Sequence, residues 1–109
     1  MAIKLPPRCS RALARHLRPE LFKALCDPRR LALLAQLAIS ERPLTVGEIS
    51  SCCSIHLSGV SRHLAMLREA SVLTAHKNGR EVSYELNRGA LVQALRGLAD
   101  AIEDCNPAT

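Results

Sequence analysis

The sequence predicts a mainly α-helical domain that carries one β-hairpin. Apolar residues recur at helical spacing through most of the 109 residues, and only the stretch 72–86 alternates as strands do. Aromatic residues are nearly absent, with one Phe, one Tyr and no Trp, so aliphatic side chains must form the core. Because a chain of this length normally forms one domain, we expect residues 1–109 to fold as a single unit of about five helices.

Two helical segments are expected in the N-terminal third. The first covers about 10–25, where leucines recur at every fourth residue, and Pro19 is the point at which it could break. The second runs from Pro28 to about Ile39. Asp27 can accept hydrogen bonds from free N–H groups of its first turn, and proline tolerates the first helical position. The residues expected to be buried on this second helix are Leu31, Leu34, Leu37 and Ala38.

A helix-turn-helix is expected over 45–70. Thr45 and Glu48 fit a capping box, in which the Thr side chain accepts from the Glu N–H and the Glu carboxylate reaches back. This box opens a short helix that extends to about Cys53. Residues 54–57 then form the turn.

The second helix of this pair is expected over 58–70. Val60, Leu64 and Leu67 fall at i, i+4 and i+7, so they share the face that packs on the core. His63 lies at the boundary between the two faces. The outward side carries polar, basic and small residues: Ser58, Ser61, Arg62, Ala65 and Arg68.

A hairpin is expected over 72–86. Asn78 and Gly79 suit a two-residue type I′ turn, which needs positive φ at both positions. Lys77 and Arg80 flank this turn, so the tip of the hairpin should be basic.

The last helix is expected over 88–104, with Asn87 as its cap. Together with the 10–25 segment it offers more apolar surface than a three-helix core needs. We therefore expect these two terminal segments to form an interface between two copies of the chain. The apolar stripe of the last helix consists of Leu91, Val92, Leu95, Leu98, Ala99 and Ile102.

The net charge of +5 favours a polyanionic partner. Residues 1–10 are expected to form a flexible basic arm, and the first eighteen residues contain five basic residues and no acid. No apolar run approaches the ~20 residues that span a bilayer. No apolar signal segment follows the N-terminus either, so we expect a cytoplasmic protein without membrane contact.

A helix-turn-helix followed by a basic hairpin is a way to bind DNA, with the second helix in the major groove and the hairpin, or wing, on phosphates. Arg62 is the best candidate for a base contact, because arginine donates two hydrogen bonds to guanine. The alternative is that these are ordinary solvated charges and that His63 is structural. The full set of candidate DNA-binding residues is Ser58, Ser61, Arg62, His63, Arg68, Lys77 and Arg80.

The segments LCDPRRLALL, LTVGEI, VSRHLAMLREASVL and NGREVSYEL resemble the ArsR/SmtB family of winged-helix repressors. The resemblance covers about 21–86. It implies a winged helix-turn-helix fold and a homodimer that reads palindromic double-stranded operator DNA, with half-sites roughly 34 Å apart. Members of the family leave their operators when they bind a metal ion or when their thiols are modified.

The best-known inducer site of the family has two cysteines at the start of the first helix of the helix-turn-helix. Thr45 and Gly47 occupy those positions here, and no histidine follows residue 88 to build the family's second type of metal site. The remaining candidates are the adjacent Cys52 and Cys53, with Cys9 as a third sulfur. Such a set suits As(III) or another soft metal ion as inducer, and no other cofactor is expected.

Other roles for the cysteines stay open. Their odd number, five, argues against a disulfide framework. Cys53 could be a small buried hydrophobe, and Cys26 is expected to be core filler. Cys105 could supply the third sulfur instead of Cys9. In a thiol-redox alternative, Cys9 or Cys105 pairs with Cys52 or Cys53.

Two rival functions are weighed against a DNA-binding repressor. An enzyme would use Cys52 or Cys53 as nucleophile and His56 as base, but no carboxylate is placed to orient that histidine. We therefore expect no enzymatic activity. A winged-helix module for protein contact or metal buffering would not need the basic residues Arg62 and Arg80.

Overall fold

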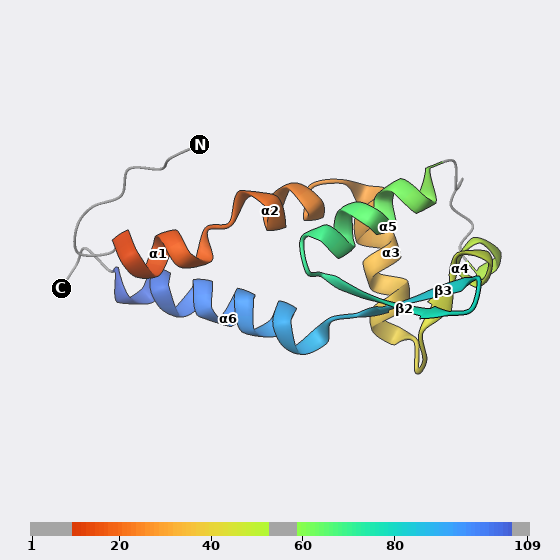
Figure 1. Ribbon diagram of the computed structural model, residues 1–109. Coiled ribbons are helices and arrows are strands. Elements are labelled where there is room, and N and C mark those ends of the chain that lie inside the picture. The colour runs from red at the N-terminus through yellow and green to blue at the C-terminus, as the bar shows by residue number, and fades with distance from the viewer. Residues whose placement is uncertain (1–9, 53–58, 106–109) are drawn as a thin grey trace.

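The computed structural model describes residues 10–52 and 59–105 (Figure 1). Within these ranges the helices and strands follow the expected order, so the mainly α-helical fold with a hairpin wing is confirmed. The first expected helix is interrupted before Pro19, as the sequence suggested. The elements are α1 (Ser10–His16), α2 (Pro19–Leu25), α3 (Pro28–Ile39), β1 (Leu44–Thr45), α4 (Val46–Cys52), α5 (Val60–Glu69), β2 (Leu73–Asn78), β3 (Glu81–Leu86) and α6 (Arg88–Asp104).

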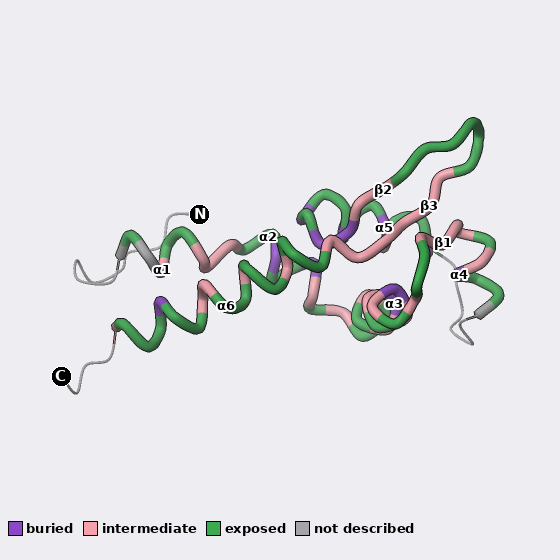
Figure 2. The backbone as a smooth tube through the Cα atoms, turned by 90° about the horizontal axis from the view of Figure 1, so that it is seen from below, coloured by how far each residue is buried: buried purple, intermediate pink, exposed green. Residues whose placement is uncertain are grey.

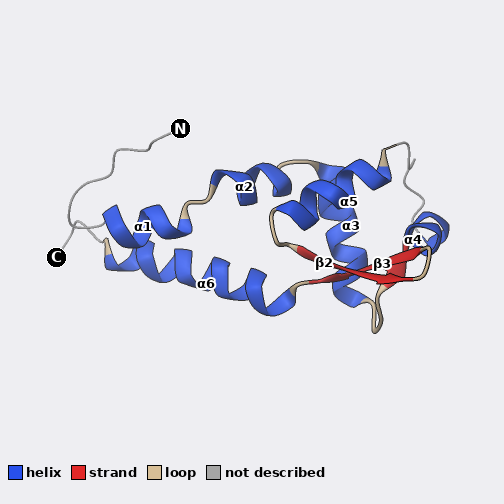
Figure 3. Ribbon diagram, viewed as in Figure 1, coloured by secondary structure: helices blue, strands red, loops and turns tan. Residues whose placement is uncertain are grey.

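The three strands, drawn red in Figure 3, form one antiparallel sheet, and their order is β1-β3-β2. The two-residue strand β1 was not expected from the sequence, and it pairs with β3 through Leu44 opposite Tyr84. Because β3 is the central strand, even its polar residues Ser83 and Glu85 are half-buried. The sheet therefore attaches the wing to the start of α4.

The expected type I′ turn at Asn78 and Gly79 is wrong by one residue. Asn78 stays in the ladder opposite Glu81, and the two loop residues are Gly79 and Arg80. Gly79 has φ of 66°, whereas Asn78 does not have a positive φ. A single positive φ at the first loop position is the requirement of a type II′ turn, and glycine meets it without strain. Arg80 therefore lies at the tip of the wing itself.

The core is formed where α2, α3, α4, α5 and the base of the sheet meet (Figure 2). The expected inner face of the second helix of the helix-turn-helix is confirmed, since Val60, Leu64 and Leu67 of α5 are buried. The other fully buried apolar side chains of large volume are Leu33, Ile49 and Val72.

The expected inner face of α3 is partly wrong. Leu37 is buried as expected, but Leu33 is also buried, and Leu31 is 48% exposed. Leu34 and Ala38 are half-buried. Residues two apart on a helix point roughly 200° away from each other, so a helix that buries Leu33 must expose Leu31. The packing of α3 against α2, α5 and β3 selects the buried face.

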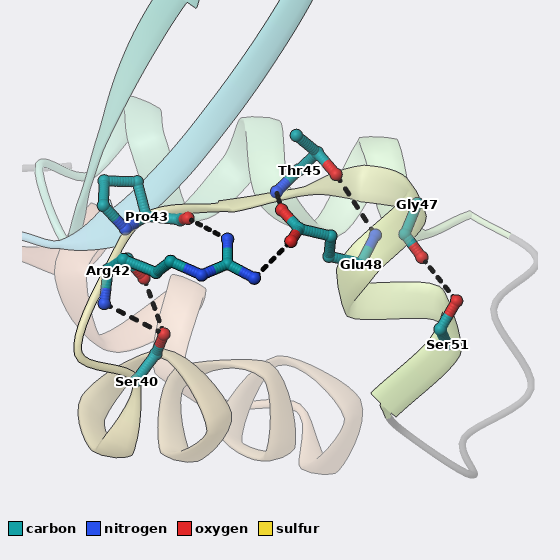
Figure 4. Close-up of polar contacts among 7 residues, drawn as sticks. All are labelled: Ser40, Arg42, Pro43, Thr45, Gly47, Glu48 and Ser51. Carbon is teal, nitrogen blue, oxygen red and sulfur yellow. Dashed lines mark hydrogen bonds and ion pairs between the residues drawn. The ribbon is translucent and has the colours of Figure 1, made fainter.

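The two predicted capping motifs are present. The Arg29 N–H donates to Asp27 Oδ1 at 2.8 Å at the start of α3. At the start of α4, the Thr45 N–H donates to Glu48 Oε1 at 3.0 Å and the Glu48 N–H donates to Thr45 Oγ1 at 3.2 Å (Figure 4). Arg42 pairs with the same Glu48 carboxylate. The hydrogen bond from the Arg42 side chain is the main cause that lowers the pKa of Glu48 to about 2, and the hydrogen bond from the Thr45 N–H is the next.

Asn87 does not cap α6 with its side chain, which corrects the expectation. Asn87 Nδ2 donates to the Ser71 carbonyl at 3.1 Å, and the Asn87 N–H donates to the Val72 carbonyl at 2.9 Å. Ser71 adopts a φ of 64° in the turn after α5, and its carbonyl is the partner that the Asn87 side chain takes instead. Asn87 therefore links the start of α6 to the end of α5.

Helices α1 and α6 lie side by side and extend away from the core (Figures 1 and 2). Gly97 makes this approach possible, because a Cβ at that position would lie 2.4 Å from His16 Cε1. Three apolar residues of α6, Val92, Leu95 and Ile102, are 40%, 43% and 56% exposed. None of the described helices is both long and apolar enough to cross a membrane.

Candidate nucleic-acid interface

Helix α5 turns its polar residues outward, as the sequence predicts. Ser61, Arg62 and Arg68 are exposed, while the apolar residues of the same helix are buried. Gly59 precedes α5 with φ of 89°, a left-handed conformation that glycine adopts without strain. Ser58 lies outside the described residues.

The wing carries the other predicted basic residues into solvent. Lys77 near the end of β2 and Arg80 in the turn are both exposed, and the hairpin projects away from the core (Figure 2). His76 and Glu85, which are diagonal neighbours on β2 and β3, pair through Nε2 and Oε1 at 2.5 Å. The tip of the wing is thus left to Lys77 and Arg80 and to the acidic Glu81.

His63 makes a contact that the sequence did not reveal. Its Nδ1 lies 3.3 Å from Nη1 of Arg30, at the start of α3. Arginine has no acceptor, so Nδ1 must be the accepting nitrogen and Nε2 carries the proton. His63 therefore has a partner within the protein, the Arg30 side chain, and its role as a DNA contact stays a prediction.

Arg30 connects three helices with one guanidinium group. Its Nε donates to the Ala24 carbonyl at 2.6 Å and its Nη2 to the Lys23 carbonyl at 2.9 Å, both in the last turn of α2. Its Nη1 contacts His63 of α5 and also lies 3.8 Å from Oδ2 of Asp27. The side chain is only 11% exposed. Arg30 thus fixes the start of α5 against the corner between α2 and α3.

The structure also adds Arg29 to the basic surface around α5. A hollow of about 300 Å³ lies between the starts of α3 and α5, and the described residues that line it are Arg29, Gly59, Arg62 and His63. The sequence does hold a signal for this site. Two arginines in the first turn of a helix oppose its positive end, an arrangement that costs stability unless the residues serve another contact.

The carboxylate of Asp27 lies next to this hollow but is occupied. It accepts from the Arg29 N–H, and Arg29 Nε lies 3.5 Å from Oδ1. The backbone hydrogen bond is the main cause that lowers the pKa of Asp27, and the Arg29 side chain lowers it further. Asp27 is therefore a capping and orienting group.

The cysteines are only partly covered by the structure. Cys52 ends α4, but its side chain, like Cys9, Cys53 and His56, lies outside what the structure describes. Cys26 is exposed and free, so the expectation that it fills the core is wrong. It follows α2 directly and lies at the surface corner before α3. Cys105, at the end of α6, is disulfide-bonded.

No group of three or more His, Cys, Asp or Glu side chains that could hold a metal ion occurs within 10–52 and 59–105. The side chains of the predicted soft-metal set, Cys9, Cys52 and Cys53, lie outside what the structure describes. The structure therefore leaves the prediction of Cys9, Cys52 and Cys53 as ligands untested.

Comparison with known proteins supports the same interpretation. A family model described as a helix-turn-helix domain matches residues 25–75. The chain is 34% identical over 89 residues to the arsenic resistance transcriptional regulator ArsR1 of Pseudomonas putida, covering 79% of this chain and 69% of that protein. It is 38% identical over 86 residues to the transcriptional repressor SmtB of Mycobacterium tuberculosis, covering 78% and 62% respectively.

A similar solved structure, an ArsR family transcriptional regulator designated RHA00566, has a TM-score of 0.63 and 27% identity. The match covers 83% of this chain and 90% of that one. Fold and surface together define a winged helix-turn-helix transcriptional regulator. The chain belongs to the ArsR/SmtB family, which consists of DNA-binding regulators and not of enzymes.

Proposed function

We propose that this protein is a repressor that binds palindromic operator DNA as a homodimer, with α5 in the major groove and the wing on the flanking phosphates. One observation carries the proposal. Helix α5 buries Val60, Leu64 and Leu67 while its opposite face presents Arg62 to solvent next to an exposed basic wing. This arrangement matches the docking geometry of winged helix-turn-helix proteins.

The exposed residues divide into two roles. Arg62, on the outward face of α5, is suited to donate two hydrogen bonds to a guanine edge and so to specify sequence. Lys77 and Arg80 on the wing are suited to phosphates, where they add salt-dependent affinity without reading bases. Ser61 and Arg68 are also exposed on α5, as is the acidic Glu69 at its end.

Support for the homodimer comes from the apolar residues that α6 leaves uncovered. Val92, Leu95 and Ile102 occupy one stripe of the helix and are about half exposed in the single chain. Apolar surface of this kind is favourable to bury against a second copy through a two-fold axis. The palindromic operator follows from that symmetry.

Arg62→Ala is expected to weaken binding to the upstream DNA of the protein's own gene by about 1–3 kcal/mol and to relax one base preference. Arg80→Ala is expected to weaken binding to all sequences alike and to reduce the salt dependence. Fluorescence anisotropy at two salt concentrations measures both effects. Arg15→Ala on α1, which removes the same charge far from α5, is the control.

The outcomes separate this proposal from its rival. A wild-type protein that binds no DNA at low salt would favour a winged-helix module for protein contact. Unchanged operator affinity of the Arg62→Ala variant would remove that residue from the base contacts.

We further propose that a thiophilic metal ion or metalloid such as As(III) releases the repressor from DNA by binding Cys52 and Cys53, with Cys9 as the third ligand. Both thiols lie in the sequence at the end of α4, the helix that precedes α5, so their ligation is suited to shift the helix-turn-helix. A relative is an arsenic resistance regulator by name.

A thiol-redox signal is the second candidate, because Cys105 is disulfide-bonded. A disulfide at this position is what an oxidised form of the protein would contain. Oxidation of a thiol pair that includes Cys105, and its reversal by a reductant, would then control DNA affinity.

Titration of the operator complex with arsenite, Cd(II), Zn(II) and peroxide distinguishes the two inducers. The doubly substituted Cys52→Ser/Cys53→Ser protein is expected to remain bound to the operator when arsenite is added. Cys105→Ser is the matched control, and arsenite should still release it from the operator. Release of the double variant by arsenite at the wild-type concentration would contradict the metalloid proposal. Loss of a peroxide response in Cys105→Ser alone would favour the redox candidate.

A further inference from the structure

The side chains that line the hollow between the starts of α3 and α5 are all basic, among the residues that the structure describes. Its side chains are Arg29, Arg62 and His63, and Gly59 contributes backbone only. Both guanidinium groups are permanently charged hydrogen-bond donors. A site of this chemistry suits an oxyanion.

Arg29 is held at the rim of the hollow and remains available. Its side chain is 58% exposed, and Asp27, which orients it, is 18% exposed and does not line the hollow. The Asp27 carboxylate already accepts the Arg29 N–H. The guanidinium therefore has donors left that face solvent, because an arginine carries five.

His63 is set up as a donor by its neighbour. Arg30 occupies Nδ1, so the neutral ring must carry its proton on Nε2. Arg30 is itself fixed by the Ala24 and Lys23 carbonyls, so the partner of Nδ1 is held in place. His63 thus adds a third donor to the hollow that it lines.

The backbone at the start of α5 also presents hydrogen-bond donors with a partial positive charge. The first N–H groups of a helix have no partner within the helix, and they carry a partial positive charge. Gly59 offers no side chain to cap them, and a Cβ at Gly59 would meet no atom within 4 Å. Gly59 itself therefore places no side chain over this end of α5.

We propose that this hollow binds one phosphodiester group of the DNA backbone, held by Arg29 and by the Nε2–H of His63. Arg62 also lines the hollow but is assigned to the bases under the proposed function. Arg29 would thereby set the depth and angle at which α5 enters the groove, because phosphate contacts fix register while base contacts specify sequence. This inference rests on the proposed DNA-binding function and names a contact within it.

Arg29→Ala is the variant that tests this site. Binding to the operator and to a scrambled duplex of equal length should weaken by about tenfold each, since a charged hydrogen bond is removed at each site. The ratio of the two affinities should stay the same. The slope of log K against log salt should fall by about 1 for each phosphate that the protein no longer neutralises. Arg62→Ala should instead lower that ratio, and Arg15→Ala should change neither quantity.

A second measurement does not depend on the stability of the variant. Operator duplexes that carry one neutral methylphosphonate at each position in turn are bound to wild-type protein and to Arg29→Ala. At one position in each half-site, the methylphosphonate should weaken DNA binding by the wild-type protein but leave binding by the Arg29→Ala protein unchanged. Arg29→Lys, which keeps the charge but not the planar fork, should show an intermediate loss.

The failures are distinguishable. If Arg29→Ala binds with wild-type affinity and salt slope while Arg62→Ala is impaired, the phosphate site is overturned and the DNA-binding function stands. The phosphate site is equally overturned if every methylphosphonate weakens both proteins to the same extent. If the wild-type protein binds neither duplex at low salt, the site and the proposed function both fall.

Discussion

Leu64→Ala is expected to lower the free energy of unfolding by about 2–5 kcal/mol, the range for a leucine truncated in a packed core. Leu64 is 0% exposed in the middle of α5, and it belongs to the single cluster that joins α2, α3, α5 and the base of the sheet. Alanine at this position leaves a cavity that the surrounding helices can fill only in part.

Urea denaturation followed by circular dichroism at fixed protein concentration measures this change. The neighbouring Ala65, which is exposed on the same helix, provides the control. Ala65→Ser should change the free energy of unfolding by no more than about 0.5 kcal/mol. Similar losses in both variants would show that α5 does not pack on the core as described.

Arg30→Met is expected to lower the free energy of unfolding by about 2–3 kcal/mol, because charge-assisted hydrogen bonds to the Ala24 and Lys23 carbonyls are removed together. Methionine keeps an unbranched apolar stem that reaches about as far as Nε, so the loss reports the guanidinium and its contacts. The variant should also weaken operator binding, because the imidazole of His63 loses the partner that fixes it.

Arg29→Ala is the matched control for stability, since the adjacent Arg29 is exposed and its ion pair lies at the surface. Exposed pairs of this kind contribute little to stability, because solvent screens them. Arg30→Lys should not restore stability, because a lysine head group cannot reproduce the planar fork of arginine. Equal stability of Arg30→Met and Arg29→Ala would contradict the role assigned to Arg30.

Features that depend on a few neighbouring residues were predictable from the sequence. The Asp27 cap and the Thr45–Glu48 capping box require only the spacing of side chains along one turn, and both are present. The inner face of α5 was also predictable, because the spacing of its apolar residues leaves one choice of buried side. The break before Pro19 follows from the missing N–H of proline.

Features that depend on residues distant in the sequence were not predictable from it. Leu31 and Leu33 are equally apolar, and only the placement of α3 against its neighbours decides which one is buried. Asn87 is a plausible cap by residue type, but the Ser71 carbonyl lies within its reach and takes its amide. The wing turn lies one residue later than predicted, because a type II′ turn needs positive φ only at its first loop position and Gly79 supplies it.

The same division applies to the candidate site. The exposed residues of α5 and the wing follow from periodicity, whereas the hollow that joins Arg29 to His63 requires two helices that are remote in sequence. The two arginines after Pro28 were a signal that sequence reasoning passed over. Cations in the first turn of a helix are unfavourable, and both prove to have contacts that offset this cost.

The arm formed by α1 and α6 makes the molecule 52 Å long and 25 Å across, with α5 and the wing at one end (Figure 1). In a molecule of this shape, a small rotation at the far end of the arm displaces α5 and the wing by several ångströms. If two copies joined through these arms, a tilt of about 6° at the join would move a point about 30 Å away by about 3 Å, nearly the ~3.4 Å rise of one base pair. A small structural change at the interface between the arms would therefore be enough to change the spacing of the two α5 helices, so that they no longer match the two halves of a palindrome.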